Sequence, residues 1–354
     1  MTVRRIALFS AYAAVLALAA YVGFHVGSGS SASPSRGEAN PSSPTADVRE
    51  EGPTVEERKL AAALRRGVGR AAALGGQVEA AAMLDSSSSP LVATSESDGA
   101  ERPMRMWSMS KVATMIALLR LLGWGKEPGE IPSPELASAL EGALTRSENC
   151  RQRRVVLELQ RAARGIAPAR ADFAEVFALA GGRATPGTQV EAPEPLCVPF
   201  LREQTEIPEP LGEALLLGTS QWRVTDAVRL AHALAVDRYG RAISTRVLTL
   251  MRAPKLPSRE SKPGELTAPL DWGAGTVFAG ADPAYKAGWG GSLNGNFLAG
   301  QIAVVPLRGG DHLSLAVMFH TDAQPSRDDP GSTTAPEALE AVMRSVWEST
   351  PDNE

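Results

Sequence analysis

The tetrapeptide Ser108-Met109-Ser110-Lys111 decides how the rest of this sequence is interpreted. A step of three residues on a helix places the Ser108 hydroxyl and the Lys111 amine on one face. A serine hydroxyl is a weak nucleophile at neutral pH, and a lysine whose pKa is lowered by burial can act as its base. Only four histidines occur in the chain, and none lies in a motif. The pair therefore predicts a nucleophilic serine that works without histidine.

Two further short motifs follow, Ser147-Glu148-Asn149 and then Lys286-Ala287-Gly288. Each of the three motifs is common by chance, so the inference depends on their order and surroundings. An apolar run from Val112 to Leu119 follows the first motif and predicts a buried helix, with the Ser-Lys pair in its first turns. The third motif lies within residues 284–291, which look like one strand of a hairpin.

The segments around the motifs predict the rest of a sheet. Residues 284–291 and 297–305 form a predicted hairpin, and 313–319 form the next strand. Residues 77–85 and 91–95 are two opening strands that precede the nucleophile helix. Apolar spacing from Val55 to Leu74 predicts a helix packed on the sheet. A further helix is expected within 218–231, where Thr225 is a suitable N-cap.

In this order the three motifs resemble the serine β-lactamase and penicillin-binding-protein superfamily, and most closely the class A β-lactamases and related serine hydrolases. The resemblance covers about residues 56 to 350. It implies an α/β (α+β) domain with a β-lactamase/transpeptidase-like fold. In that fold an antiparallel five-stranded sheet is flanked by helices, with an all-helical subregion.

The resemblance also implies the catalytic roles. Ser108 is the acylated nucleophile, and Lys111 is its activating partner. Ser147 relays a proton toward the leaving nitrogen, and Lys286 supplies positive potential for a carboxylate of the substrate.

Four positions are implied to bind the substrate. Asn149 holds its amide, while Ala287 lies in the middle of the third motif. Gly288 lets the strand edge come close, because a side chain there would block the approach. The backbone N–H groups of Ser108 and Trp289 form the implied oxyanion hole.

Three departures from the family pattern change what is expected. Ala287 stands where the family mostly has Thr or Ser, so a carboxylate of the substrate loses one hydrogen-bond donor. Only 39 positions separate Ser108 from Ser147, which predicts a more open cleft. Glu148 stands where Asp is usual, a change of one methylene that decides little.

The base for deacylation is not identified by the sequence. The family relies on a glutamate in a loop that corresponds to residues 187–218. Glu194 and Glu209 each precede a proline, as in the family, but neither is followed by the expected asparagine. The glutamates in this region are Glu191, Glu194, Glu203, Glu206, Glu209 and Glu213. Glu194 and Glu209 are therefore only candidates.

Composition bounds the remaining functions. The 354 residues are 44% apolar, which is enough for one large domain, and the net charge of −4 gives no nucleic-acid footprint. The basic residues Arg151, Arg153 and Arg154 are expected to form a solvated helix face. No Cys or His spacing indicates a metal, and no cofactor is expected. The chain is expected to be monomeric.

The N-terminal segment predicts a membrane attachment. Arg4 and Arg5 precede a run from Ile6 to Val26 without Asp, Glu, Lys or Arg, about the length that spans a bilayer. Residues 1–26 are interpreted as an uncleaved signal anchor, with a cleaved signal peptide and a secreted protein as the alternative. Residues 27–55, rich in Ser, Pro and Gly, form a predicted tether that leads to a catalytic domain at 56–350 outside the cytoplasm.

Cys150 and Cys197 are the only cysteines. In an exported chain an even number favours a disulfide, and two buried thiols are the alternative. A disulfide would tie the residue after Asn149 to the loop in which the deacylating base is expected.

Two functions remain open. The first is a serine hydrolase that forms an acyl-serine at an amide, with a β-lactam or a D-alanyl-D-alanine peptide of peptidoglycan as substrate. The second is a binding or sensor module that keeps the fold and does not turn over. Release of more than one equivalent of product per Ser108 would distinguish them.

Overall fold

The computed structural model describes residues 53–96, 102–125, 133–191, 213–253, 272–291, 297–321 and 334–350. The helices are α2 (Val55–Ala72), α3 (Ser110–Leu121), α4 (Pro134–Thr145), α5 (Asn149–Ala162), α6 (Ile166–Leu179), α8 (Val224–Ala235), α9 (Arg241–Arg252), α10 (Ala274–Val277) and α11 (Thr334–Trp347). Short 3-10 helices are η2 (Trp107–Met109), η3 (Leu217–Thr219), η4 (Ala279–Ala281) and η5 (Arg308–Gly310). The strands are β1 (Gln77–Leu84), β2 (Leu91–Thr94), β3 (Met104–Arg105), β4 (Val190–Glu191), β5 (Ala214–Leu215), β6 (Gln221–Trp222), β7 (Ala284–Gly291), β8 (Phe297–Pro306) and β9 (His312–Thr321).

Five strands form one antiparallel sheet in the order β2-β1-β9-β8-β7. Segments from the two ends of the folded chain meet in its centre, where Glu79 of β1 lies opposite Met318 of β9. The opening strands, the hairpin and the strand that follows it are confirmed, as is the expected fold class. The strand that carries the third motif, β7, lies at one edge of the sheet, so one side of its backbone is open to other groups.

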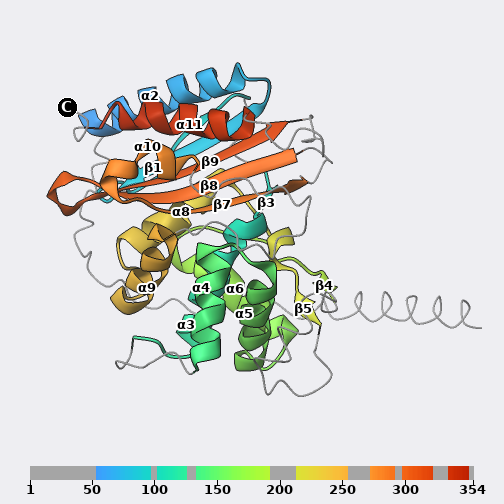
Figure 1. Ribbon diagram of the computed structural model, residues 1–354. Coiled ribbons are helices and arrows are strands. Elements are labelled where there is room, and N and C mark those ends of the chain that lie inside the picture. The colour runs from blue at the N-terminus through green and yellow to red at the C-terminus, as the bar shows by residue number, and fades with distance from the viewer. Residues whose placement is uncertain are drawn as a thin grey trace, which may run out of the picture. The chain divides into compact units, whose positions relative to one another are not determined.

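Helices α2 and α11 cover one face of this sheet (Figure 1). A capping box fixes the start of α2, because Thr54 accepts from the Glu57 N–H and the Glu57 carboxylate accepts from the Thr54 N–H. Leu60, Leu64 and Val68 then follow one another along its buried side. The predicted packing helix is confirmed, and it begins at Val55 as expected.

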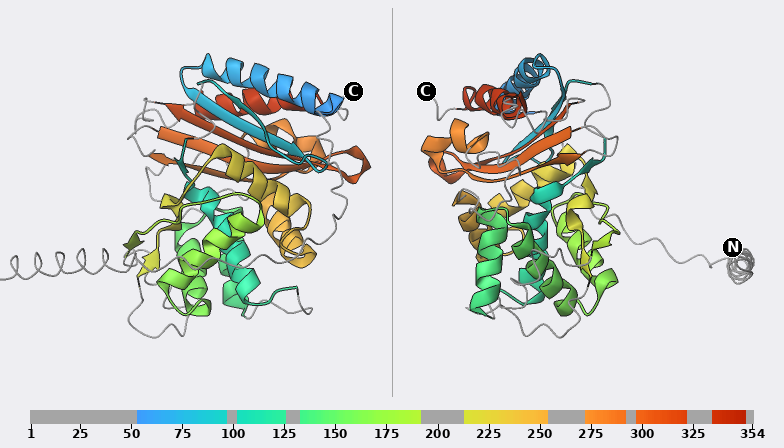
Figure 2. Two further views of the ribbon diagram at one scale, coloured as in Figure 1. Left: turned by 180° about the vertical axis from the view of Figure 1, so that it is seen from behind. Right: turned by 45° about the vertical axis from the view of Figure 1, so that its right-hand side comes forward.

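The other face of the sheet is covered by the helical subregion (Figures 1 and 2). Helix α3 runs through the middle of this subregion and contacts α4, α5, α6 and α9. Every residue of α3 from Ser110 to Leu119 is buried, which explains why this apolar run shows almost no polar face. The helix that follows Ser108 is therefore held on all sides, as a rigid support for a nucleophile requires.

The start of α8 differs from the sequence expectation. Thr225 was expected to be the N-cap, but the N-cap residue is Arg223. The Asp226 carboxylate accepts from the Arg223 N–H at 3.1 Å and from the Arg183 N–H at 2.8 Å. Because this buried carboxylate satisfies the N-terminal N–H, the helix begins at Val224, two residues earlier than a Thr225 cap would allow.

The expected anchor and nearly all of the tether lie outside the described residues. Within the described ranges, no helix combines the length and the apolar character that a bilayer span requires.

Candidate active site

The three motifs converge on the hydroxyl of Ser147, in the turn between α4 and α5. The Lys286 amine, from β7, donates to Ser147 Oγ at 2.9 Å. The Lys111 amine, from α3, lies 3.3 Å from the same oxygen and donates to the Ser147 carbonyl at 2.5 Å. It also donates to Asn149 Oδ1 at 3.0 Å. Residues far apart in the sequence thus form one connected hydrogen-bond network.

Strand geometry explains how Lys286 reaches this network. Side chains alternate between the faces of a strand, so Lys286 and Gly288 face the helical subregion. Ala287 and Trp289 face the opposite side, where they pack with the apolar cluster under α2 and α11. Only 3% of Lys286 is exposed, and its amine also donates to the Ala287 carbonyl at 2.9 Å.

Gly288 brings β7 into direct contact with the turn that bears Ser108. A Cβ at this position would lie 3.0 Å from the Met106 carbonyl oxygen and 3.1 Å from the backbone nitrogens of Ser108 and Met109. These are backbone atoms, so only glycine allows the strand to approach this closely. The close approach is the condition under which N–H groups of Ser108 and Trp289 can serve one oxyanion.

Two residues of the site have a backbone conformation that side chains disfavour. Trp107, which directly precedes Ser108, has φ +45°, and Ser147 has φ +57°. A bulky residue at positive φ is a conformational outlier that costs about 1 to 3 kcal/mol. The Trp107 ring packs against Gly290, where a Cβ would collide with it, and the Arg105 guanidinium lies 5.6 Å from the ring centroid. These contacts hold the strained turn in place.

Burial sets the protonation of both amines. Burial and the nearby charge of Lys286 hold the pKa of Lys111 well below its ordinary value of 10.5, although Glu148 partly opposes this. Burial alone lowers the pKa of Lys286 to about 7. A buried amine that gives up its proton near neutral pH can accept one from a serine hydroxyl. The site therefore has the electrostatics that a lysine base requires.

Arginine side chains brace the turn that contains Ser147. The Glu148 carboxylate accepts from Arg151 Nε at 2.7 Å and from Arg146 Nε at 2.5 Å. Arg151 also donates to Ser138 of α4. Charge-assisted bonds of this kind fix the orientation of the turn more firmly than neutral ones.

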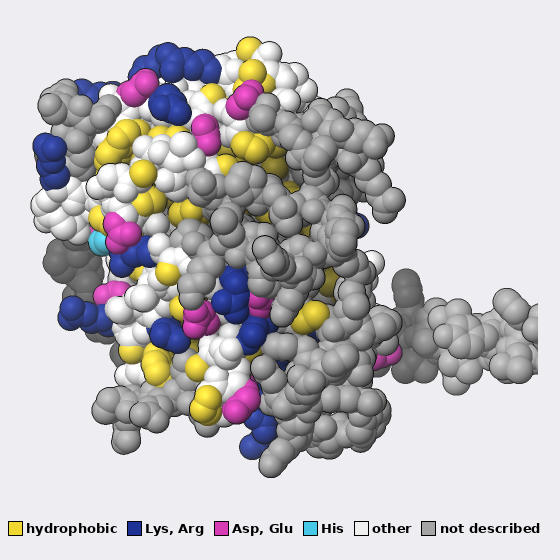
Figure 3. All heavy atoms as spheres, in the orientation of Figure 1, with side chains coloured by type: hydrophobic (Ala, Val, Ile, Leu, Met, Phe, Trp, Pro, Cys, Tyr) yellow, Lys and Arg dark blue, Asp and Glu magenta, His cyan; other side chains and the backbone are white. Residues whose placement is uncertain are grey.

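The expectation of a solvated basic face on α5 is wrong for two of its three arginines. Arg154 is only 8% exposed and forms an ion pair of 2.5 Å with Glu158, while Arg151 binds Glu148. Each of these two arginines pairs with a carboxylate three or four residues away, Arg151 with Glu148 at the N-cap and Arg154 with Glu158 within the helix. On the face shown in Figure 3, Lys and Arg side chains likewise lie among Asp and Glu side chains.

The loop expected to carry the deacylating base begins and ends as a narrow ribbon. Thr185 pairs with Gln221, and β4 pairs with β5 farther along. Glu194 and Glu209 lie outside the described residues, so their roles stay predictions. Glu213 is exposed, and its carbonyl accepts from the Gln160 side chain on α5.

Cys150 is the second residue of α5, directly after Asn149. No cysteine within the described ranges is a free thiol. Cys197 lies outside these ranges, so its pairing with Cys150 stays a prediction. Within the same ranges, no cluster of three His, Cys, Asp or Glu side chains is arranged to hold a metal.

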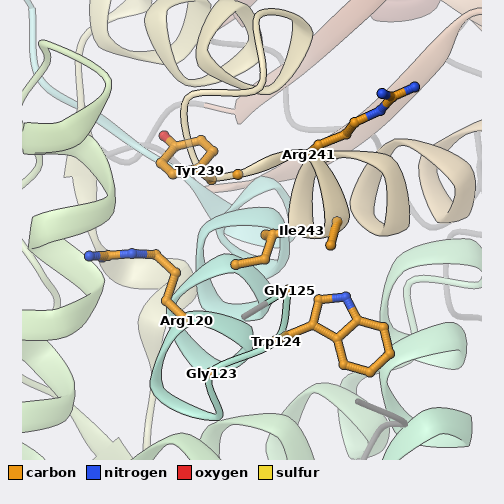
Figure 4. Close-up of a pocket in the computed structure, with 9 residues that line it drawn as sticks. Arg120, Gly123, Trp124, Gly125, Tyr239, Arg241 and Ile243 are labelled. Carbon is orange, nitrogen blue, oxygen red and sulfur yellow. The ribbon is translucent and has the colours of Figure 1, made fainter. Parts of the chain in front are cut away.

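A separate cavity of about 300 Å³ lies at the opposite end of α3 from Ser108 (Figure 4). Its walls include Arg120, Trp124, Tyr239 and Arg241. The Arg120 guanidinium is engaged by Glu175 at 2.9 Å, and the Tyr239 hydroxyl donates to the Val176 carbonyl at 2.9 Å. The length of the buried helix separates this cavity from the catalytic motifs.

Sequence reasoning missed the residues that support the site. The conformation of Trp107 depends on its packing against Gly290, and the bond of Arg151 to Ser138 joins two helices, so neither follows from local sequence. One signal was available, because Glu148 and Arg151 are three residues apart on a predicted helix start.

Comparison with known proteins identifies the fold. No family model matches the chain, and no curated protein matches it. Among solved structures, a β-lactamase from Chitinophaga pinensis DSM 2588 is 16% identical, with a TM-score of 0.50 over 80% of this chain and 98% of that one. TLA-1 extended spectrum β-lactamase is 14% identical, with a TM-score of 0.53 over 82% and 98%. TLA-3 extended-spectrum β-lactamase is 13% identical, with a TM-score of 0.51 over 81% and 98%. The chain therefore has the β-lactamase fold.

Proposed function

We propose that this chain is a serine hydrolase that forms an acyl-serine at Ser108 from an amide of the β-lactam or D-alanyl-D-alanine type. The observation that carries this proposal is the convergence of the Lys111 and Lys286 amines on Ser147, next to the turn that bears Ser108. The β-lactamase fold supports it, and the lowered pKa of both lysines gives the network its chemistry.

In the proposed acylation, Ser108 Oγ attacks the carbonyl carbon of the amide and its proton passes to the neutral Lys111 amine. The proton then moves through the Ser147 hydroxyl to the leaving nitrogen as the C–N bond breaks. The backbone N–H groups of Ser108 and Trp289 stabilise the oxyanion. Water afterwards attacks the Ser108 ester, which releases the acid and restores the hydroxyl.

Asn149 and Lys286 complete the proposed site on the substrate side. The Asn149 side chain is exposed at the start of α5, and its Oδ1 already accepts from Lys111, which leaves the amide nitrogen for a substrate carbonyl. Lys286 supplies the positive potential, and Gly288 the open strand edge.

A second function is a penicillin-binding-like sensor or binding module that acylates and does not turn over. Ala287 favours it, because the hydroxyl that helps to hold a carboxylate in related motifs is missing. Measuring product released per Ser108 separates the two functions: more than one equivalent requires turnover.

We propose further that the domain is a monomer tethered outside the cytoplasm by residues 1–26, and that Cys150 pairs with Cys197. The run from Ile6 to Val26, which contains no Asp, Glu, Lys or Arg, supports the anchor, and export supports the disulfide.

The test of the proposed function is covalent labelling of the purified chain. A labelled penicillin and a fluorophosphonate should modify Ser108 in the wild type and in Ser110→Ala, but not in Ser108→Ala. Peptide mapping by mass spectrometry locates the adduct. A label on Ser110 or Ser147, or full hydrolysis by Ser108→Ala, would contradict the proposal.

A further inference from the structure

The second motif places a carboxylate beside the groups that bind the Lys111 amine. This amine donates to the Ser147 carbonyl at 2.5 Å and to Asn149 Oδ1 at 3.0 Å. Glu148 stands between these two residues, as the N-cap of α5, and only 16% of its side chain is exposed. Burial and the charge of Lys286 hold the pKa of Lys111 well below 10.5, and the charge of Glu148 opposes both. An unscreened carboxylate at this position would therefore favour the protonated amine.

Two arginines bind this carboxylate, one at each oxygen. Arg146 Nε donates to Glu148 Oε1 at 2.5 Å, and Arg151 Nε donates to Glu148 Oε2 at 2.7 Å. Arg151 also donates to Ser138 of α4 at 2.5 Å. The three charged side chains are no more than 21% exposed, so solvent ions screen the two pairs only weakly. The carboxylate is thus turned toward α4 by its partners, while the residues on either side of it bind Lys111.

Helix α4 leaves space for this ion pair. Gly142 lies inside α4 and is buried, and a Cβ there would collide with Arg151 Cδ and lie 2.6 Å from Glu148 Oε2. Glycine destabilises a helix interior relative to alanine, and here the missing side chain lets the pair pack against the helix. The Gly142 carbonyl also accepts from the N–H groups of Arg146 and Glu148, each at 3.2 Å. Space for the pair and the path of the turn therefore depend on the same residue.

The pairing matters for the proposed chemistry because a buried carboxylate without its cation is strongly unfavourable. If the arginines were absent, the Lys111 amine would be the cation that already binds both neighbours of Glu148. An ion pair with Glu148 would keep Lys111 protonated, and a protonated amine cannot accept the proton of Ser108.

We propose that Arg146 and Arg151 are positioning residues for the acylation of Ser108. They engage Glu148, so its carboxylate does not pair with Lys111. This inference rests on the proposed acyl-serine function and adds two residues to it that touch neither the substrate nor the reacting atoms.

The test measures how fast a fluorophosphonate labels Ser108 in the full chain, from about pH 5 to about pH 10. In this reaction Ser108 Oγ forms a bond to phosphorus, the P–F bond breaks, and the hydroxyl proton passes to the base. Fluoride leaves without a proton, so the rate reports activation of the serine and not the relay through Ser147. The midpoint of the acid limb marks the pH at which the coupled amines supply a neutral base.

We expect Arg151→Gln to move this midpoint to higher pH by about half a unit or more, because the released carboxylate favours a protonated Lys111. Arg151→Lys keeps the positive charge and should restore the wild-type midpoint. Adding Glu148→Gln to Arg151→Gln should restore it as well, since no carboxylate remains to be paired. As a matched control, Arg154→Gln removes another buried arginine of α5, one that pairs with Glu158, and should leave the midpoint unchanged.

The inference is overturned if Arg151→Gln slows labelling equally at every pH, because the arginine would then only brace the turn. A shift that persists after Glu148→Gln is added overturns it too. Arg146→Gln releases the other oxygen of the same carboxylate, and it takes the place of Arg151→Gln if that variant does not fold. Absence of labelling at Ser108 of the wild type at every pH refutes the proposed function itself, and the inference with it.

Discussion

Replacing Gly288 with alanine should slow acylation of Ser108 about tenfold to a hundredfold in a protein that still folds. The new Cβ would lie 3.0 Å from the Met106 carbonyl oxygen and 3.1 Å from the Ser108 and Met109 nitrogens. These atoms belong to the backbone, so no side chain can rotate to relieve the contact. Strand β7 and the turn at Ser108 must therefore move apart.

The expected size of the effect follows from the geometry of the oxyanion hole. Its donors act over about 2.7 to 3.1 Å, and removing one costs on the order of 10² to 10³ in rate. A shift of a few tenths of an ångström weakens the hydrogen bond of the Trp289 N–H without abolishing it, so the loss should be smaller. The added methyl should also lower the free energy of unfolding by about 1 to 3 kcal/mol.

Gly300→Ala is the matched control. Gly300 lies directly opposite Gly288 on β8, but the closest contacts of a Cβ there would be side-chain atoms of Met318 and Met109, which can move, with the Val317 carbonyl oxygen farther away at 3.3 Å. This variant should lose stability and keep its acylation rate within about threefold, since it displaces no oxyanion donor. Rates are measured by stopped flow, and stability by urea unfolding. The reasoning would be refuted if Gly288→Ala were acylated at the wild-type rate, or if both variants were slowed equally.

Three other predictions concern protonation, the cysteines and turnover. Burial lowers the pKa of Lys286 from 10.5 to about 7. Between these two pH values the folded protein therefore binds fewer protons than the unfolded chain. The free energy of unfolding should rise with pH across this window, by about 5 kcal/mol. Urea unfolding at several pH values should show this rise, and Lys286→Met should make it shallower; an unchanged slope would contradict the assigned burial. Cys150 and Cys197 should form a disulfide in exported protein and stabilise the folded domain by about 3 to 4 kcal/mol. Thiol counting under denaturing, non-reducing conditions tests this prediction. Two free thiols would refute it. A chromogenic cephalosporin should give a burst of about one equivalent and then a slow steady rate, because neither Glu194 nor Glu209 has the sequence context expected of a deacylating base. Fast linear turnover would show that a base exists, and Glu→Gln substitutions at Glu194 and Glu209 would test the two candidates first.

The sequence could predict the strands, because they follow from local patterns, and the convergence of the motifs was implied by the family resemblance. Once residues 284–291 are recognised as a strand, the side chains of Lys286 and Ala287 are expected on opposite faces of the sheet. The positive φ of Trp107 and Ser147 could not be predicted, since tertiary contacts hold both residues in conformations that their own side chains disfavour. The cap of α8 was assigned to the wrong residue because the Asp226 carboxylate also serves Arg183, which is distant in the sequence.

The arrangement around Ser147 implies that the two lysines work as a coupled pair. Both amines are buried and lie within hydrogen-bonding distance of the half-buried Ser147 hydroxyl, and two full positive charges there would repel each other at low dielectric. The charge on Lys286 therefore helps to keep Lys111 neutral, in the direction that its lowered pKa shows. A neutral Lys111 can accept the proton of Ser108, while a charged Lys286 can still donate to Ser147 and polarise its hydroxyl toward the leaving nitrogen. Division of labour between two chemically identical side chains thus follows from burial and distance alone, and it explains how this chain could activate a serine without a histidine in any of its motifs.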